Sequence, residues 1–194
     1  MDKIFDLNTV LKNRFLILSC AVLILGTVFG TSMLKFLPEE VLKNLFGFLS
    51  NRPSDFMNEF INKLSFPLLI LISLYFSGSG IFGSFTAPFL VFIYGAFYGF
   101  ENSLNYMFYG ADYIVNCMIS FFTGTFFYGF AILLMSENSI FSSKSIMNCI
   151  KEKSEEKPHY NAKKQAVKLV AFTACFAIVS VFSTFISLFV RSRG

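Results

Sequence analysis

The sequence is poor in charge and in several residue types that carry chemistry. Only 14% of its 194 residues are Asp, Glu, Lys or Arg, while 55% are hydrophobic. Soluble domains carry roughly a quarter charged residues. Trp is absent, and the single His, His159, stands in a run of charged residues with no second metal ligand beside it. This composition excludes an ordinary soluble domain and indicates an integral membrane protein.

Motifs of enzymes are also missing. The sequence contains no zinc motif, no nucleophile elbow and no P-loop. Its four cysteines have no CxxC spacing, and three of them lie in apolar segments, so we interpret them as packing residues. No pair of ionisable residues falls within an apolar segment long enough to span a membrane. We therefore expect a protein that is not an enzyme, with no catalytic residue, no cofactor and no metal.

One long apolar stretch, from residue 65 to residue 100, contains no charged residue and no His. One helix crosses the hydrocarbon core with about 20 residues, so this stretch is too long for a single crossing. Its middle, SGSGIFG over residues 77–83, is rich in glycine, and Pro88 follows. The pattern predicts two apolar helices, about 66–80 and 85–100, joined by a glycine-rich bend. Each arm is short for a crossing, so the hairpin either spans twice or is re-entrant.

Three further apolar segments complete the predicted membrane domain. They cover residues 15–34, 113–135 and 169–190. The first is longer than the apolar core of a signal peptide and has no cleavage motif after it, so we expect an uncleaved helix. The predicted fold is all-α: a polytopic helical bundle with about five spans, forming one membrane domain over residues 1–194.

The hydrophilic segment 38–64 carries two predicted amphipathic helices, each too short to span. Pro38 and two glutamates suit the start of the first helix. We expect both helices to lie on the outer membrane surface, where they either cap the bundle or present a docking face to a partner. The apolar residues proposed for docking are Val41, Leu42, Leu45, Phe46, Leu49, Phe56, Met57, Phe60 and Ile61.

A second hydrophilic segment, 137–168, carries seven lysines. With five spans and the N-terminus in the cytoplasm, ten of the 16 Lys and Arg residues lie on the cytoplasmic side. This distribution fits the positive-inside tendency. We therefore expect a multi-pass protein of the plasma membrane with a cytoplasmic N-terminus and a cytoplasmic Lys-rich loop. The formal charge of +4 does not indicate a nucleic-acid partner, because the basic residues lie between apolar spans.

Glycines are spaced for close helix packing in two places. GTVFG at residues 26–30 and GAFYG at residues 95–99 are both GxxxG patterns, which let helix backbones approach closely. The pattern leaves open whether the contact lies within one chain or joins two copies in a homo-oligomer. The candidate packing positions are Gly26, Gly30, Gly78, Gly80, Gly83, Gly95 and Gly99.

The order of these parts resembles one protein family. The first span ends with GTVFG, an amphipathic segment follows, and then comes ISLYFSGSGIFGSFTAPFLVFIYGAFYGF. These features are similar to the stage II sporulation protein M family of small five-pass membrane proteins. The resemblance implies a non-enzymatic scaffold, like the family member that gathers peptidoglycan-degrading enzymes at the septal membrane. Its partners would then be membrane lipid and other membrane or cell-wall proteins, among them peptidoglycan hydrolases.

A second hypothesis is a small permease or channel-like transporter. Interrupted membrane helices often form binding sites, and the glycine-rich hairpin would be the place where an uncharged or small solute passes.

Overall fold

The computed structural model describes residues 7–50, 56–110, 126–152 and 162–191, and the regular structure in these ranges is helical. This confirms the all-α prediction. The elements are α1 (Leu7–Met33), the short 3₁₀ turn η1 (Leu34–Phe36), α2 (Glu39–Ser50), α3 (Phe56–Gly78), α4 (Gly83–Tyr109), α6 (Gly129–Glu152) and α7 (Ala162–Arg191). A π-helical turn over residues 126–128 leads into α6.

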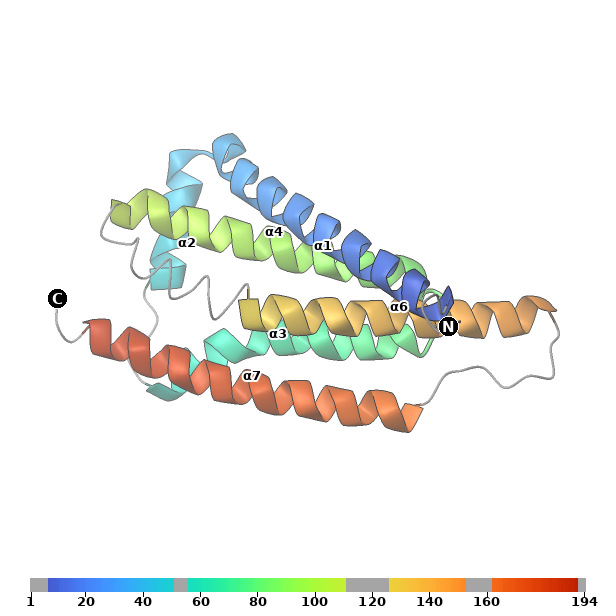
Figure 1. The fold of residues 1–194 in the computed structure, drawn as a ribbon. Helices are drawn as coiled ribbons and strands as arrows, with labels where there is room; N and C mark the ends of the chain where they lie inside the picture. The colour runs from blue at the N-terminus through green and yellow to red at the C-terminus, as the bar shows by residue number, and fades with distance from the viewer. Residues whose placement is uncertain (1–6, 51–55, 111–125, 153–161, 192–194) are drawn as a thin grey trace.

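Helix α6 occupies the centre of the bundle. It contacts α1 and α4 on one side and α3 and α7 on the other, as Figure 1 shows. The start of α1, the α3–α4 turn and the start of α7 lie toward one end of the bundle, while α2 and the end of α7 lie toward the other. We refer to the first as the N-terminal end and to the second as the α2 end.

Four helices within the described ranges are long and apolar enough to cross a membrane: Arg14–Phe36, Phe56–Gly78, Gly83–Tyr109 and Gln165–Phe185. They indicate an integral membrane protein. The predicted span 113–135 falls mostly outside the described residues, and its last ten residues form the π-helical turn and the start of α6. The described ranges therefore hold four candidate spans, against the five that the sequence predicted.

The hairpin arms are longer than predicted. Helix α3 has 23 residues and α4 has 27, which correspond to about 35 and 40 Å at 1.5 Å per residue. The predicted separate amphipathic helix from Phe56 to Leu64 is the first part of α3. The predicted boundary between residues 64 and 66 is therefore absent. Pro67 lies just after it inside α3, where proline removes only one backbone hydrogen bond and is tolerated in membrane helices. Residues beyond it, such as Ile70 and Leu74, are buried in the bundle and hold the helix together.

The predicted Lys-rich loop is also mostly helical. Helix α6 runs on to Glu152 and α7 begins at Ala162, so only residues 153–161 of the predicted loop 137–168 lie outside the described helices. The reason lies in the small polar side chains of α6, several of which are buried against other helices. A buried serine with an interhelical hydrogen bond packs as a core residue, whereas the sequence pattern treats it as hydrophilic.

The apolar core lies around α6. Ile132, Met135 and Ile140 of α6 are buried in one cluster with residues of α3, α4 and α7, namely Ile70, Leu71, Leu74, Ala87, Val91, Tyr94 and Phe176. By contrast, the outer faces of α1 and α7 expose large apolar side chains such as Ile17, Ile24 and Val170. These outer faces are suited to contact with lipid.

Candidate functional site

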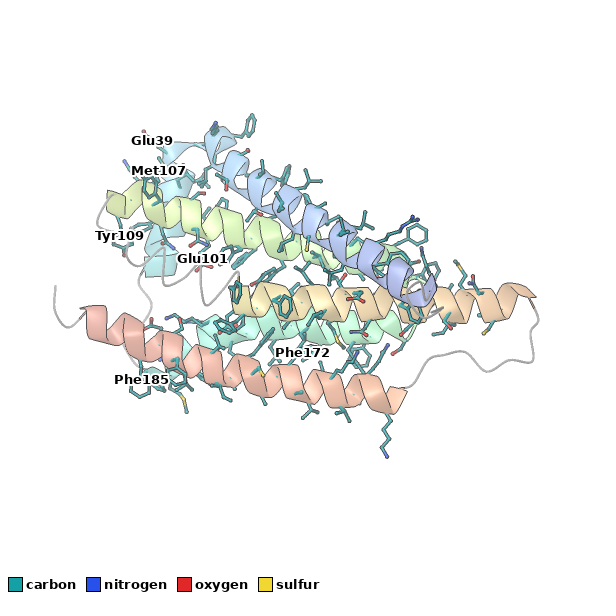
Figure 2. All side chains as sticks on the ribbon, viewed as in Figure 1. Glu39, Glu101, Met107, Tyr109, Phe172 and Phe185 are labelled. Atoms are coloured by element: carbon teal, nitrogen blue, oxygen red, sulfur yellow. The ribbon has the colours of Figure 1, made fainter. Side chains whose placement is uncertain are left out.

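The predicted docking residues of α2 contact the rest of the chain. Leu42 is buried, and the ring of Phe46 stacks on Phe108 of α4 with centroids 4.1 Å apart. Tyr109 meets the same Phe46 ring edge-on at 5.2 Å. Figure 2 places Tyr109, Met107 and Glu39 at this end of the bundle. Within the apolar stripe of α2, Phe46 therefore packs on α4 and Leu42 is buried, while Val41 remains exposed and Leu49 lies outside the residues whose side chains are described.

The four predicted docking residues of α3 divide into two sets. The ring of Phe56 lies 5.2 Å from that of Phe185 in α7 and 6.4 Å from that of Phe60. Met57 and Ile61 point away from the bundle, with 62% and 51% of their surfaces exposed. The structure thus leaves only part of the predicted docking set available to another molecule.

An ion pair within α3, which the sequence analysis did not anticipate, lies beside α7. Lys63 Nζ is 3.1 Å from Glu59 Oε1 and donates a hydrogen bond of 3.1 Å to the backbone oxygen of Ser183. Glu59 is buried. Its i,i+4 spacing to Lys63 was visible in the sequence, but the approach of α7 was not.

The two GxxxG patterns meet each other within this chain. A Cβ atom at Gly26 or Gly30 would overlap backbone oxygens of α4, at Phe92 and Ala96. In the same way, a Cβ at Gly99 would overlap the carbonyl oxygen of Thr27. Gly95 faces the backbone of α1. The glycines therefore let the backbones of α1 and α4 touch. This contact lies within one chain, which is one of the two alternatives that the GxxxG spacing left open.

Hydroxyl groups add to the α1–α4 contact. Ser103 Oγ lies 3.2 Å from Thr31 Oγ1, and Thr31 Oγ1 lies 3.5 Å from the carbonyl oxygen of Gly99. These groups lie beyond the glycines, toward the α2 end.

The α3–α4 turn is covered by α6. A Cβ at Gly78 would lie 2.9 Å from Cα of Ser139, and one at Gly83 would lie 2.9 Å from Cβ of Ser143. Ser143 Oγ donates to the carbonyl oxygen of Ile81 at 2.7 Å and accepts from the amide of Ser84 at 3.1 Å. Gly80 is different, because the nearest atom to its Cβ position is 3.8 Å away.

Buried polar side chains of α6 form the feature that the sequence analysis missed. Ser136 Oγ lies 3.2 Å from Ser19 Oγ of α1, and Ser139 Oγ donates to the carbonyl oxygen of Leu74 in α3 at 2.5 Å. Glu137 between them is 2% exposed. The sequence did contain one signal of this helix, because residues 136, 139 and 143 are spaced to lie on one helical face. The segment was nevertheless predicted to be a hydrophilic loop because its side chains are polar.

Three further polar pairs join α6 and its preceding turn to α7. Tyr128 Oη lies 2.6 Å from Ser180 Oγ. Lys168 Nζ donates to Asn138 Oδ1 at 2.7 Å. The amide nitrogen of Gln165 donates to Ser142 Oγ. We call these three pairs the polar bridge.

No family model, no curated protein and no solved structure matches this chain. Within the described ranges, no group of three or more His, Cys, Asp or Glu side chains is placed to hold a metal ion.

Proposed function

We propose that this chain is a non-enzymatic scaffold of the plasma membrane that holds partner proteins, as the resemblance to the stage II sporulation protein M family implies. The observation that carries the proposal is that the residues of the interior are engaged in helix contacts, whereas apolar residues at the α2 end are exposed. Interior glycines and serines are engaged in contacts between helices, whereas large apolar side chains at or near the α2 end remain exposed. They are Phe36, Val41, Met57, Ile61, Tyr106, Met107 and Tyr109. Peptidoglycan-degrading enzymes are the partners that the resemblance suggests.

Capture of partners tests this proposal. The variant Met57→Asp with Ile61→Asp places two charges on exposed positions of α3. Its matched control, Asn58→Asp with Asn62→Asp, adds the same charge at exposed polar positions of the same helix. We expect cross-linked pull-down from native membranes to recover cell-wall hydrolases or their anchors with the wild type and the control, and to lose them with the apolar-site variant. Equal recovery by all three proteins would contradict this docking surface.

The topology that we propose has five crossings with the N-terminus in the cytoplasm. The alternating directions of α1, α3, α4, α6 and α7 in Figure 1 support it. The lysines in the first part of α7, whose start lies at the N-terminal end, also support it. A variant whose only cysteine is Cys149 should resist an impermeant maleimide in intact cells and react after permeabilisation. The same background with Cys149 removed and Glu40→Cys added on α2 should react in intact cells. The reverse pattern would overturn this orientation.

A small permease is the second candidate, and the buried Glu137 on α6 favours it, because ionisable residues inside membrane proteins often mark transport routes. The glycine-rich bend offers less support, since α6 covers Gly78 and Gly83. A permease for an uncharged solute predicts faster glycerol or urea entry into proteoliposomes than into empty liposomes. It also predicts a changed rate in Glu137→Gln. Flux equal to that of empty liposomes would exclude these two solutes.

A further inference from the structure

The α3–α4 turn is apolar where it faces outward. It lies in the middle of the stretch from residue 65 to residue 100, which contains no charged residue. Phe82 in the turn and Phe85 in the first turn of α4 are 74% and 78% exposed, and Ile81 beside them is also exposed. Contiguous exposed apolar side chains mark a surface that meets another protein or a membrane.

Several polar backbone groups of this turn are bonded within the protein. Ser143 Oγ of α6 donates to the carbonyl oxygen of Ile81 at 2.7 Å and accepts from the amide of Ser84 at 3.1 Å. The amide of Gly80 donates to the carbonyl oxygen of Ser77 at 3.2 Å. Irregular backbone is tolerated at membrane depth only where protein or a water-filled cavity satisfies it. The cover that α6 provides therefore suits a turn that lies in the membrane.

The charged residues of α1 give a scale for the depth of this turn. Arg14 and Lys35 are both exposed, and residues 15–34 between them are uncharged. As a helix, this uncharged segment measures about 30 Å, which matches the hydrocarbon core of a bilayer at about 30 Å. Arg14 therefore marks one edge of the hydrocarbon core.

The turn lies near that edge. Lys144 Nζ of α6 is 4.2 Å from the centre of the ring of Phe15, the first residue inside the edge. Ser143, which adjoins Lys144, is the residue that bonds to Ile81 in the turn. Helix α6 continues from this level to Glu152, about two turns further. In Figure 1 its end projects beyond the α3–α4 turn.

We propose that the α3–α4 turn is a membrane-embedded tip, in which Ile81, Phe82 and Phe85 contact the phospholipids of the leaflet at the N-terminal end. These side chains lie at the boundary between headgroups and acyl chains, where apolar faces of interfacial helices insert. Helix α6 continues past the tip into water. The exposed Arg14 and Lys144 at the same level favour lipid as the occupant, because basic residues are attracted to anionic headgroups.

This inference is independent of the proposed function. A scaffold and a permease could both have an embedded tip, and the tip requires neither a protein partner nor a particular side of the membrane.

The test uses the absence of Trp from the sequence, so that each variant of the full chain carries one fluorophore. Phe82→Trp is reconstituted in lipid nanodiscs, which expose both faces of the membrane. Two quenchers are compared: a phosphatidylcholine brominated in the upper part of its acyl chains, and acrylamide in the water. We expect the bromolipid to remove most of the Trp fluorescence, acrylamide to remove little, and the emission to be shifted to shorter wavelength than that of Trp in water.

Two single-Trp variants at exposed apolar positions provide the references. Ile178→Trp lies within the candidate span of α7 and reports contact with lipid, while Ile150→Trp lies on α6 beyond the turn and reports contact with water. The ratio of bromolipid to acrylamide quenching decides the test. A ratio for Phe82→Trp closer to that of Ile178→Trp supports the embedded tip, and one closer to that of Ile150→Trp overturns it.

A third outcome would also overturn the proposal. If neither quencher reaches Phe82→Trp, a protein surface covers the turn, and a second copy of the chain becomes the occupant to test. Phe85→Trp repeats the measurement at a second exposed position of the tip and decides in the same way if Phe82→Trp does not fold.

Discussion

The α1–α4 pair and the α6–α7 pair are held together by different means. In the α1–α4 pair, glycines bring the two backbones into contact, and α1 packs mainly against α4. In the second, the contact runs through side chains that reach across, namely Tyr128, Lys168 and Gln165. Lipid provides no hydrophobic drive for helix association, so close packing and interhelical hydrogen bonds must supply it.

This difference predicts how each pair responds to change. A backbone contact made through glycine tolerates no added atom, because a neighbouring backbone cannot move aside as a flexible side chain can. A hydrogen bond between membrane helices contributes little by itself, about 0.6 kcal/mol on average. Removing one hydrogen bond of the polar bridge should therefore lower the stability of the protein only slightly. A single substitution at a glycine of the α1–α4 contact should lower it much more.

The largest effect is expected from Gly30→Ala. The added methyl group would overlap the carbonyl oxygen of Ala96, and forced overpacking costs about 3 kcal/mol at the upper end of its usual range. Gly47→Ala in α2 is the matched control, because nothing lies within 4 Å of its Cβ position. The control should stabilise its helix by about 0.5 kcal/mol. Thermal unfolding in detergent measures both, and equal midpoints for the two variants would contradict the backbone contact.

Removal of Lys63 should have the next largest effect. Lys63→Met leaves the buried Glu59 without the ammonium group 3.1 Å away and removes the bond to Ser183 in α7. Breaking a buried pair costs about 3–5 kcal/mol, and we expect about 2 kcal/mol because Lys63 is only partly buried. Adding Glu59→Gln should restore part of the loss. A double variant that is less stable than Lys63→Met alone would argue against the ion pair as the cause.

The sequence was informative about the hairpin because its signals are local. An uncharged stretch, three glycines and a proline predict two apolar helices with a bend, and α3, the turn and α4 follow that pattern. The GxxxG spacings likewise mark positions where a helix can approach closely. They do not name the partner helix, which is why the sequence left a homo-oligomer open and the contact between Gly26 and Phe92 could not be foreseen.

Longer-range contacts explain what could not be predicted. The apolar stripe of α2 is plain in the sequence, but its cover, Phe108, lies more than sixty residues away in α4. Ser139 and Ser142 looked hydrophilic because their partners, Leu74 and Gln165, are on other helices. A polar residue is placed in a core by the partner that it finds there, and a single sequence does not show that partner.

Gly78→Ala should have an intermediate effect, because the α3–α4 turn meets α6 less closely than α1 meets α4. The added Cβ would lie 2.9 Å from Cα of Ser139. We expect a loss of about 1–2 kcal/mol. Gly80→Ala, with 3.8 Å to the nearest atom, should be nearly neutral and serves as the control. A neutral Gly78→Ala would mean that α6 does not cover the turn, and the permease hypothesis would gain support.

The smallest effect is expected from Tyr128→Phe, which removes one hydrogen bond of the polar bridge and keeps the ring against Phe176. We expect a loss of about 0.6 kcal/mol, and no further loss when Ser180→Ala is added, because the two changes remove the same bond. Tyr106→Phe at an exposed position is the control. A double-mutant cycle by thermal unfolding measures the coupling. Additive losses would show that the two hydroxyls act separately. A coupling as large as the Gly30→Ala effect would mean that one hydrogen bond holds α7 as firmly as backbone packing holds α1, and the contrast between the two pairs would fail.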